Sequence, residues 1–114
     1  RDSGEKSFVS LDNIEQTVAQ MLDAIHDGLY AKAKKNLEDN TYACATLEEV
    51  KEKMAARGGF AKTMWCGDEA CEVRMKEEAG VTSRCIPFEQ EHLGNTCACC
   101  GKPAKHMVVW GVAY

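Results

Sequence analysis

CGDEAC at positions 66–71 and CACCGK at positions 97–102 hold five of the seven cysteines of this chain. Each stretch offers two thiolates across a short loop, and a longer segment joins the two stretches. Because short loops bring two ligands together cheaply, two such pairs are typical of a structural zinc site with four thiolate ligands. The pattern predicts that one metal ion holds together two turns that are distant in the sequence.

The expected metal ligands are Cys66, Cys71, Cys97 and Cys100. In the second stretch a two-residue gap lets both sulfur atoms face one ion, and Gly101 can adopt the positive φ of a tight metal-binding turn. Cys99 stays open as an alternative to Cys100. The two remaining cysteines, Cys44 and Cys85, have apolar neighbours and no partner cysteine nearby, so they are interpreted as small buried hydrophobic residues.

Two other uses of the cysteines are less favoured. A disulfide framework fits poorly with an odd cysteine count, no hydrophobic signal segment and 28% charged residues, which are features of a cytoplasmic protein. Thiol–disulfide exchange would use Cys97 and Cys100 as a C-x-x-C pair. Such a pair usually opens a helix, however, and Gly101 and Pro103 disfavour a helix start at this point.

Composition limits the remaining functions. A chain of 114 residues with 45% hydrophobic residues suits one compact domain, and the aromatic share of only 7% makes a metal staple physically useful. No apolar run has membrane-spanning length. The net charge of −4 disfavours nucleic-acid binding. A zinc-ribbon-like tRNA-binding module is nevertheless kept as the alternative function, and its contacts would be Lys32, Lys34, Lys35, Lys102 and Lys105.

Three helices are predicted from periodicity and capping residues. Apolar residues at gaps of three and four predict a long helix from about residue 14 to 37, with Asp12 and Glu15 as its capping box. A second helix begins after Thr46, which pairs with Glu49, and ends at residues 57–59. The third follows the first cysteine stretch, starts near residue 68 and ends at Gly80.

Three strands are predicted at 60–65, 81–88 and 106–114, the last from a clear alternation. Strand, helix and strand within about thirty residues indicate a βαβ unit with parallel strands and a right-handed crossover. The fold class is therefore α/β (α+β). A long N-terminal helix and a second helix precede a small βαβ-β sheet, which a four-cysteine zinc site staples at its edge.

Four ordered motifs carry a family resemblance: WCGDEACE at 65–72, TSRCIPF at 82–88, CACCGKPAK at 97–105 and WGVAY at 110–114. Together they closely resemble the C-terminal domain of prolyl-tRNA synthetase of the archaeal and eukaryotic type, which some bacteria also carry. The resemblance implies that residues 1–9 end an anticodon-binding domain, that 10–59 form a helical linker, and that 60–114 form the zinc-binding α/β domain.

The resemblance also implies a function. The full enzyme would be a class II proline–tRNA ligase, a cytoplasmic homodimer that uses ATP and magnesium to attach proline to tRNA(Pro). This fragment shows no class II ATP-binding motif, so it is expected to be a structural and docking part without catalytic residues. Its partners would be the catalytic and anticodon-binding domains of the same polypeptide, with no membrane contact. The carboxylate of Tyr114 would reach toward the active site.

Overall fold

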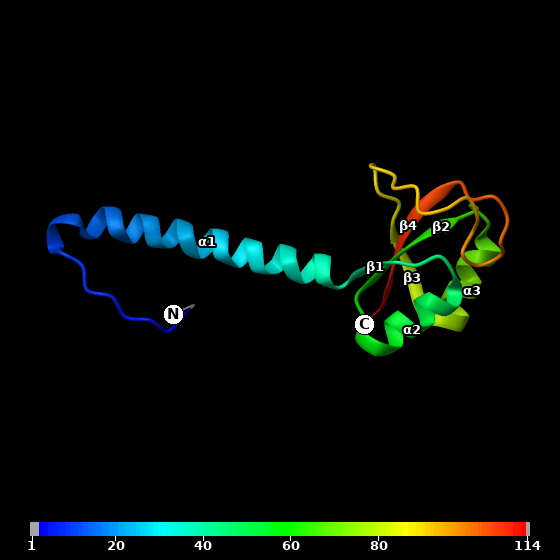
Figure 1. Ribbon diagram of the computed structural model, residues 1–114, viewed down its shortest axis with the longest axis horizontal. Coiled ribbons are helices and arrows are strands. Elements are labelled where there is room, and N and C mark those ends of the chain that lie inside the picture. The colour runs from blue at the N-terminus through cyan, green and yellow to red at the C-terminus, as the bar shows by residue number, and fades with distance from the viewer. Residues whose placement is uncertain (1–2, 114) are drawn as a thin grey trace. The chain divides into compact units, whose positions relative to one another are not determined.

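The computed structural model describes residues 3–113, and the chain divides into two compact units, Arg1–Asn36 and Leu37–Tyr114. Most of the first unit is α1, Ile14–Asp39, which the periodicity predicted (Figure 1). A 3₁₀ turn at Leu11–Asn13 leads into it. The cap of that turn is Ser10, whose side chain accepts a hydrogen bond from the Asp12 amide, rather than the expected Asp12.

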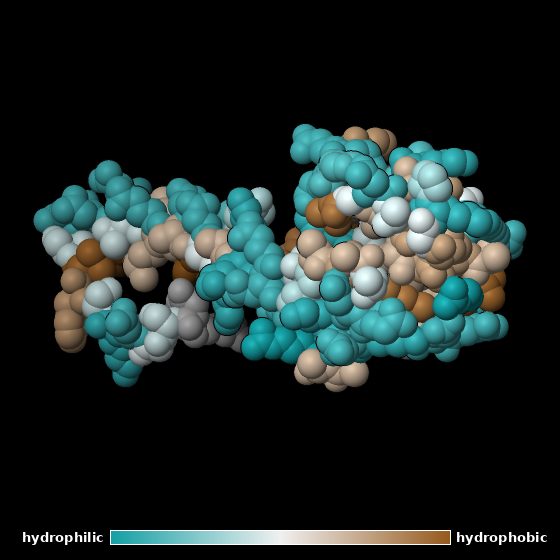
Figure 2. Space-filling model, turned by 45° about the vertical axis from the view of Figure 1, so that its right-hand side comes forward, coloured by the Kyte–Doolittle hydropathy of each residue, from teal (hydrophilic) through white to brown (hydrophobic). Residues whose placement is uncertain are grey.

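No described residue of α1 is buried. Its apolar stripe therefore lies at the surface, and Figure 2 shows brown residues exposed on this unit between hydrophilic ones. The exposed members of the stripe are Ile14, Val18, Met21, Leu22 and Leu29. None of the helices in the described part of the chain is both long enough and apolar enough to cross a membrane.

The second unit, called here the C-terminal unit, contains a mixed four-stranded sheet. The strands are β1 (Thr41–Ala43), β2 (Phe60–Trp65), β3 (Val81–Cys85) and β4 (His106–Val112), in the spatial order β1-β2-β4-β3. β1 is parallel to β2, and β4 is antiparallel to both β2 and β3. The fold is thus α+β, as predicted.

The topology corrects the expected βαβ unit in one respect. β2 and β3 run in the same direction, since both are antiparallel to β4, but β4 lies between them. The neighbouring parallel pair is instead β1 and β2. The physical reason lies in β4, where Met107, Val108 and Trp110 are buried from both faces, as is usual for a central strand. β1 has only three residues and escaped prediction, and β3 stops at Cys85, short of 88.

Two helices pack on one face of this sheet (Figure 1). They are α2, Leu47–Arg57, and α3, Glu69–Ala79. As predicted, Thr46 caps α2 by accepting from the Glu49 amide, and the Glu49 carboxylate in turn accepts from the Ala45 amide at 2.7 Å. The core between helices and sheet consists of Cys44, Leu47, Val50, Met54, Ala61, Met75, Val81, Val108 and Trp110.

The connection between α2 and β2 requires glycine. Gly59 has φ of +93°, and a Cβ atom there would lie 2.3 Å from the carbonyl oxygen of Asn40. That carbonyl accepts a hydrogen bond from the Phe60 amide at 2.8 Å, which aligns β2 with β1. Residues 37–59 therefore belong to the same compact unit as the sheet, whereas the sequence placed them with the helical linker.

The core contains one buried polar pair, which yields a first prediction. The indole Nε1 of Trp110 donates to Oγ1 of Thr63 at 2.9 Å, and Thr63 is 1% exposed. Thr63→Val keeps the side-chain shape but leaves the indole N–H without its acceptor, so we expect unfolding to become easier by about 1–3 kcal/mol. Thr82→Val, at the half-buried face of β3, serves as the control. Equal midpoints of chemical unfolding for the two variants would contradict the assignment.

Candidate metal centre

Four cysteines converge at the end of β2. Their Sγ atoms, from Cys66, Cys71, Cys97 and Cys100, all lie within 4.8 Å of one another, and we call this group the cysteine cluster. Sγ of Cys66 is 3.7 Å from Sγ of Cys71 and 3.7 Å from Sγ of Cys100. Four sulfur atoms arranged tetrahedrally at about 2.3 Å from a zinc ion are separated by about 3.8 Å. The donor set and its spacing therefore fit a tetrahedral metal ion.

The first pair is positioned by the turn from β2 into α3. Cys66 directly follows β2, and Gly67, with φ of +89°, reverses the chain toward α3. Asp68 caps α3 through its side chain, and its carbonyl accepts hydrogen bonds from the Cys71 amide at 3.0 Å and from the Trp65 indole at 3.2 Å. Strand end, turn and first helical turn thus place both thiols on one side.

The second pair lies in a tight turn that two main-chain hydrogen bonds close. The Cys97 amide donates to the carbonyl of Lys102 at 2.8 Å, and the Gly101 amide donates to the carbonyl of Cys97 at 2.9 Å. Gly101 has φ of +71°, the conformation that the sequence analysis expected of it. The turn thereby places the sulfur atoms of Cys97 and Cys100 within 4.8 Å of each other and of the first pair.

Main-chain hydrogen bonds hold this second turn against β2. β1 leaves the edge of β2 at Cys44, and the amide of Ala98 then bonds to the next available acceptor, the carbonyl of Met64, at 3.0 Å. On the other side, the Lys105 amide donates to the carbonyl of Trp65 at 2.8 Å. The two acceptors, Met64 and Trp65, are the last two residues of β2 before Cys66, and their carbonyls point to opposite sides of the strand. The sheet itself therefore brings the two cysteine pairs together.

Backbone amides and burial act on the thiols in opposite directions. Burial raises the pKa of Cys66 and of Cys71. At Cys97 burial also acts to raise the pKa, but hydrogen bonds from the amides of Cys100 and Cys99, with a further one from Cys66, outweigh it and lower the pKa to about 7. Amides directed at a sulfur stabilise its thiolate form, which is the form that binds metal.

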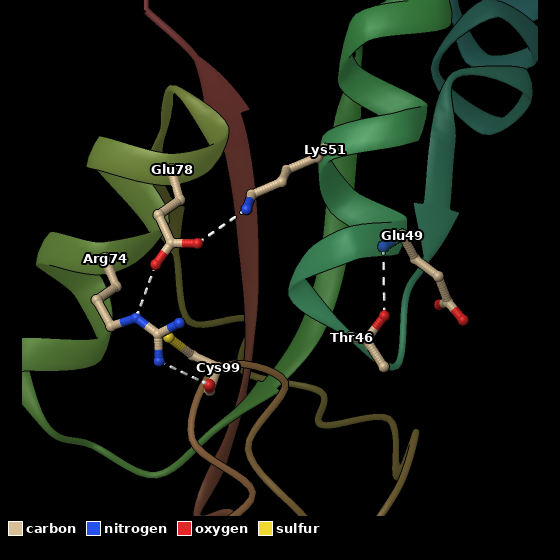
Figure 3. A network of polar contacts seen from close by, with 6 residues as sticks. All are labelled: Thr46, Glu49, Lys51, Arg74, Glu78 and Cys99. Carbon is tan, nitrogen blue, oxygen red and sulfur yellow. Dashed lines mark hydrogen bonds and ion pairs between the residues drawn. The ribbon is translucent and has the colours of Figure 1, made fainter.

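Charged side chains link the turn at Cys99 to both helices (Figure 3). Nη1 of Arg74 donates to the carbonyl oxygen of Cys99 at 3.1 Å, and Nε of Arg74 pairs with Glu78 at 2.9 Å. Lys51 of α2 reaches the same Glu78 carboxylate at 2.8 Å. Such exposed pairs add little stability. Their role is geometric, because they hold the turn that carries Cys99 and Cys100 beside α3.

The other residues that the sequence analysis named lie in different environments. Cys99 packs against the cysteine cluster but is not one of the four mutually close thiols. Cys44 is buried in the core, as expected. Cys85 was expected to be buried and is exposed, because β3 is an edge strand and the chain leaves the sheet at this residue. Tyr114 lies outside the described residues.

The lysines of the alternative tRNA-binding function are divided between the two units. Lys32, Lys34 and Lys35 belong to α1, in the other unit. Lys102 lies 3.7 Å from the carboxylate of Asp68, and Lys105 lies over Gly67. The lysines near the cluster are therefore balanced in part by an acidic residue, and this arrangement does not favour phosphate binding.

The sequence matches a known protein family over more than half of its length. The family described as the C-terminal region of prolyl-tRNA synthetase matches residues 47–114. The chain belongs to this family. It is 52% identical over all 114 residues to proline–tRNA ligase 2 of Bacillus thuringiensis subsp. konkukian and to proline–tRNA ligase of Clostridium novyi. It covers 24% of the length of each of these relatives.

A solved structure in the same family agrees with the fold. The crystal structure of prolyl-tRNA synthetase from Cryptosporidium parvum, complexed with L-proline and AMP, superimposes with a TM-score of 0.87 at 26% identity. The match covers 96% of this chain and 24% of that one. The chain thus spans about a quarter of the length of the relatives it matches.

Some contacts that build the site carried no signal in the sequence. Ala98 and Met64 align the two turns through backbone groups, which any residue type supplies. Arg74 holds the Cys99 carbonyl across 25 positions of sequence. Trp65 was noted as a strand residue and as the start of the family motif at 65–72, but its hydrogen bond to the Asp68 carbonyl in the first turn was not predicted.

Proposed function

We propose that this chain is the C-terminal structural part of a proline–tRNA ligase and that a zinc ion bound by the cysteine cluster stabilises its fold. One observation carries the proposal. Four thiol sulfur atoms lie within 4.8 Å of one another in a chain that is 52% identical, over its whole length, to a proline–tRNA ligase. The ligands would be Cys66, Cys71, Cys97 and Cys100, with Cys100 in preference to Cys99.

The donor set supports a structural rather than a catalytic metal. Catalytic zinc sites keep one coordination position open for water or substrate, whereas four protein thiolates fill all positions of a tetrahedral ion. Three of the four cysteines are buried, which also limits access by substrate. When bound, zinc would supply only cross-linking bonds between the β2–α3 turn and the 97–102 turn.

Activity, substrates and partners belong to the whole polypeptide. By its family, that polypeptide would ligate proline to tRNA(Pro) in the cytoplasm with ATP and magnesium, as a homodimer. Within the chain, residues 1–9 would end an anticodon-binding domain, and the helical linker would be limited to the part of 10–59 that precedes the second unit, up to residue 36. Tyr114 would contact the active site of the full enzyme.

A comparison of the chain with the full-length polypeptide tests this function. The full-length protein is expected to catalyse proline-dependent exchange between ATP and pyrophosphate and to charge tRNA(Pro), because the relatives over the whole chain are ligases. The 114-residue chain alone is expected to bind one zinc ion and to show no exchange. Exchange by the chain alone, or full-length exchange with an amino acid other than proline, would refute the assignment.

A further inference from the structure

A fifth thiol lies beside the cysteine cluster. Cys99 is half-buried and packs against Cys66, Cys71 and Cys97. Its thiol interacts directly with the thiol of Cys71, although it is not one of the four mutually close sulfur atoms. Four thiolates fill every position of a tetrahedral ion. Cys99 is therefore a nucleophilic group that contacts the metal site and is not needed to bind the metal.

The surrounding structure holds Cys99 next to α3. Arg74, one helical turn after Cys71, donates to the Cys99 carbonyl oxygen at 3.1 Å (Figure 3). The charge of the same guanidinium interacts with the thiols of Cys99 and Cys71. On the other side, the amide of Ala98 donates to the Met64 carbonyl at 3.0 Å. The helix that carries Cys71 thus also carries the residue that fixes Cys99.

Two disulfide partners of Cys99 can be compared by geometry. Cys100 is its neighbour in the sequence, but consecutive Cα atoms lie only about 3.8 Å apart. Disulfide bonds usually join Cα atoms about 4.4–6.8 Å apart, so a bond between adjacent cysteines is strained. Cys71 belongs to a separate element, α3, and its thiol already interacts with that of Cys99. Cys71 is therefore the better-placed partner.

We propose that Cys99 makes zinc retention sensitive to peroxide, through a disulfide bond between Cys99 and Cys71. This rests on the proposed function, because it requires zinc in the cysteine cluster. The Cys99 thiol takes one oxygen atom from hydrogen peroxide and becomes a sulfenic acid, with release of water. The Cys71 thiolate then attacks the Cys99 sulfur atom, and the S–S bond forms as hydroxide leaves. Peroxide accepts the two electrons that the two sulfur atoms lose.

Oxidation begins at Cys99 because the ligand itself is protected. Cys71 is only 4% exposed, whereas Cys99 is half-buried and is not bound to the ion. The disulfide bond removes one of the four zinc ligands, so the ion keeps three thiolates and is bound much more weakly. Because the ion joins the β2–α3 turn to the 97–102 turn, its release loosens the C-terminal unit.

Zinc release from the zinc-loaded 114-residue chain tests this proposal. The chain is treated with hydrogen peroxide beside a chromogenic zinc chelator, and its disulfide bonds are mapped by mass spectrometry. Wild type should release zinc and yield the Cys71–Cys99 peptide pair, and a thiol reductant with added zinc should restore the metal. Cys99→Ser should hold zinc and release it roughly tenfold more slowly or less, because peroxide must then reach buried ligands.

Cys85→Ser is the matched control. It removes an exposed cysteine of the same unit that lies outside the cysteine cluster, so zinc release should keep the wild-type rate. Equal release rates in wild type and Cys99→Ser would overturn the proposal and leave the metal site intact. So would zinc that stays bound to wild type in peroxide, or a mapped disulfide bond that joins other cysteines.

Zinc content before oxidation separates the remaining outcomes. A Cys99→Ser chain that holds no zinc, beside a wild type that does, would make Cys99 a ligand and would overturn the proposal. A wild-type chain that holds no zinc after metal is added would instead refute the proposed metal site itself, and the peroxide sensitivity would fail with it.

Discussion

Removal of zinc is expected to unfold the C-terminal unit. Zinc binding by small four-ligand sites contributes about 10–16 kcal/mol near neutral pH, as much as the whole stability of a typical domain, about 5–15 kcal/mol. The buried residues of this unit include three of the four cysteines, Cys66, Cys71 and Cys97. Without the ion, the two turns are joined by a few backbone hydrogen bonds and by exposed polar contacts of Arg74 and Lys102, which add little stability.

The two tryptophans report on this unfolding selectively. Trp65 precedes the first ligand and Trp110 lies in the core, and the chain has no others. We expect a chelator under reducing conditions to shift their fluorescence to that of solvent-exposed indole and to abolish the cooperative thermal transition of the unit. Helicity from α1 is a separate signal, because α1 contributes no buried residue to this core.

Reversibility provides the control for chelation. The same chelator saturated with zinc should leave the fluorescence unchanged, and zinc added back to the reduced, metal-free chain should restore it. If the tryptophan fluorescence and the thermal midpoint stay the same after metal analysis confirms removal, the ion does not hold the fold, and the structural role proposed for it fails.

Replacement of Cys100 by serine is expected to lose the metal, whereas replacement of Cys99 is not. Sγ of Cys100 lies 3.7 Å from Sγ of Cys66 and belongs to the mutually close set. Changes in residues that merely support metal ligands cost 10–100-fold in affinity, so loss of a ligand should cost more than about 100-fold. Cys99→Ser should keep one zinc ion per chain.

The backbone explains why Cys99 cannot simply replace its neighbour. Its carbonyl is held by Arg74, and the preceding residue, Ala98, is bonded to both Met64 and Leu47. A movement of the Cys99 main chain that carries its sulfur atom into the fourth position would break these contacts. The two variants are a matched pair, since they change adjacent residues of one turn in the same way.

Zinc and cobalt titrations distinguish these outcomes. Each variant is stripped of metal, loaded with Co²⁺ and followed by the visible absorption that reports thiolate ligands, and then zinc is added in competition. Wild type and Cys99→Ser should show the same four-thiolate spectrum. Full loading and an unchanged spectrum in Cys100→Ser would show that Cys99 is the true ligand or an effective substitute.

Local chemistry explains which parts of the fold were predictable. The ends of α2 and α3 are set by capping groups a few positions away in the sequence, which are Thr46, Asp68 and Gly80. These ends could therefore be predicted without any tertiary contact. β2 was predicted over its full range because Gly59 marks its start and Cys66 marks its end. In contrast, β1 has only three residues and depends on its pairing with β2.

Long-range pairing explains the rest. β4 could lie at the edge of the sheet or between β2 and β3. Its place depends on which faces are covered by α2 and α3, and no local pattern reports that. The exposure of Cys85 follows from this strand order. The end of β3 at this residue could not be predicted either, because the Gln90 side chain takes the place of β3 beside Met107.

The sequence by itself determined the helices, the main strands, the family and the cysteines from which a metal site could be built. These follow from residue spacing and from groups that interact within one or two turns of chain. Only the tertiary structure decided the central place of β4, the convergence of Cys66, Cys71, Cys97 and Cys100, and the exposure of Cys85 and Phe88. These depend on backbone hydrogen bonds and on burial between segments tens of residues apart. Backbone groups are supplied by nearly any residue type, and no local pattern reports which distant segments meet.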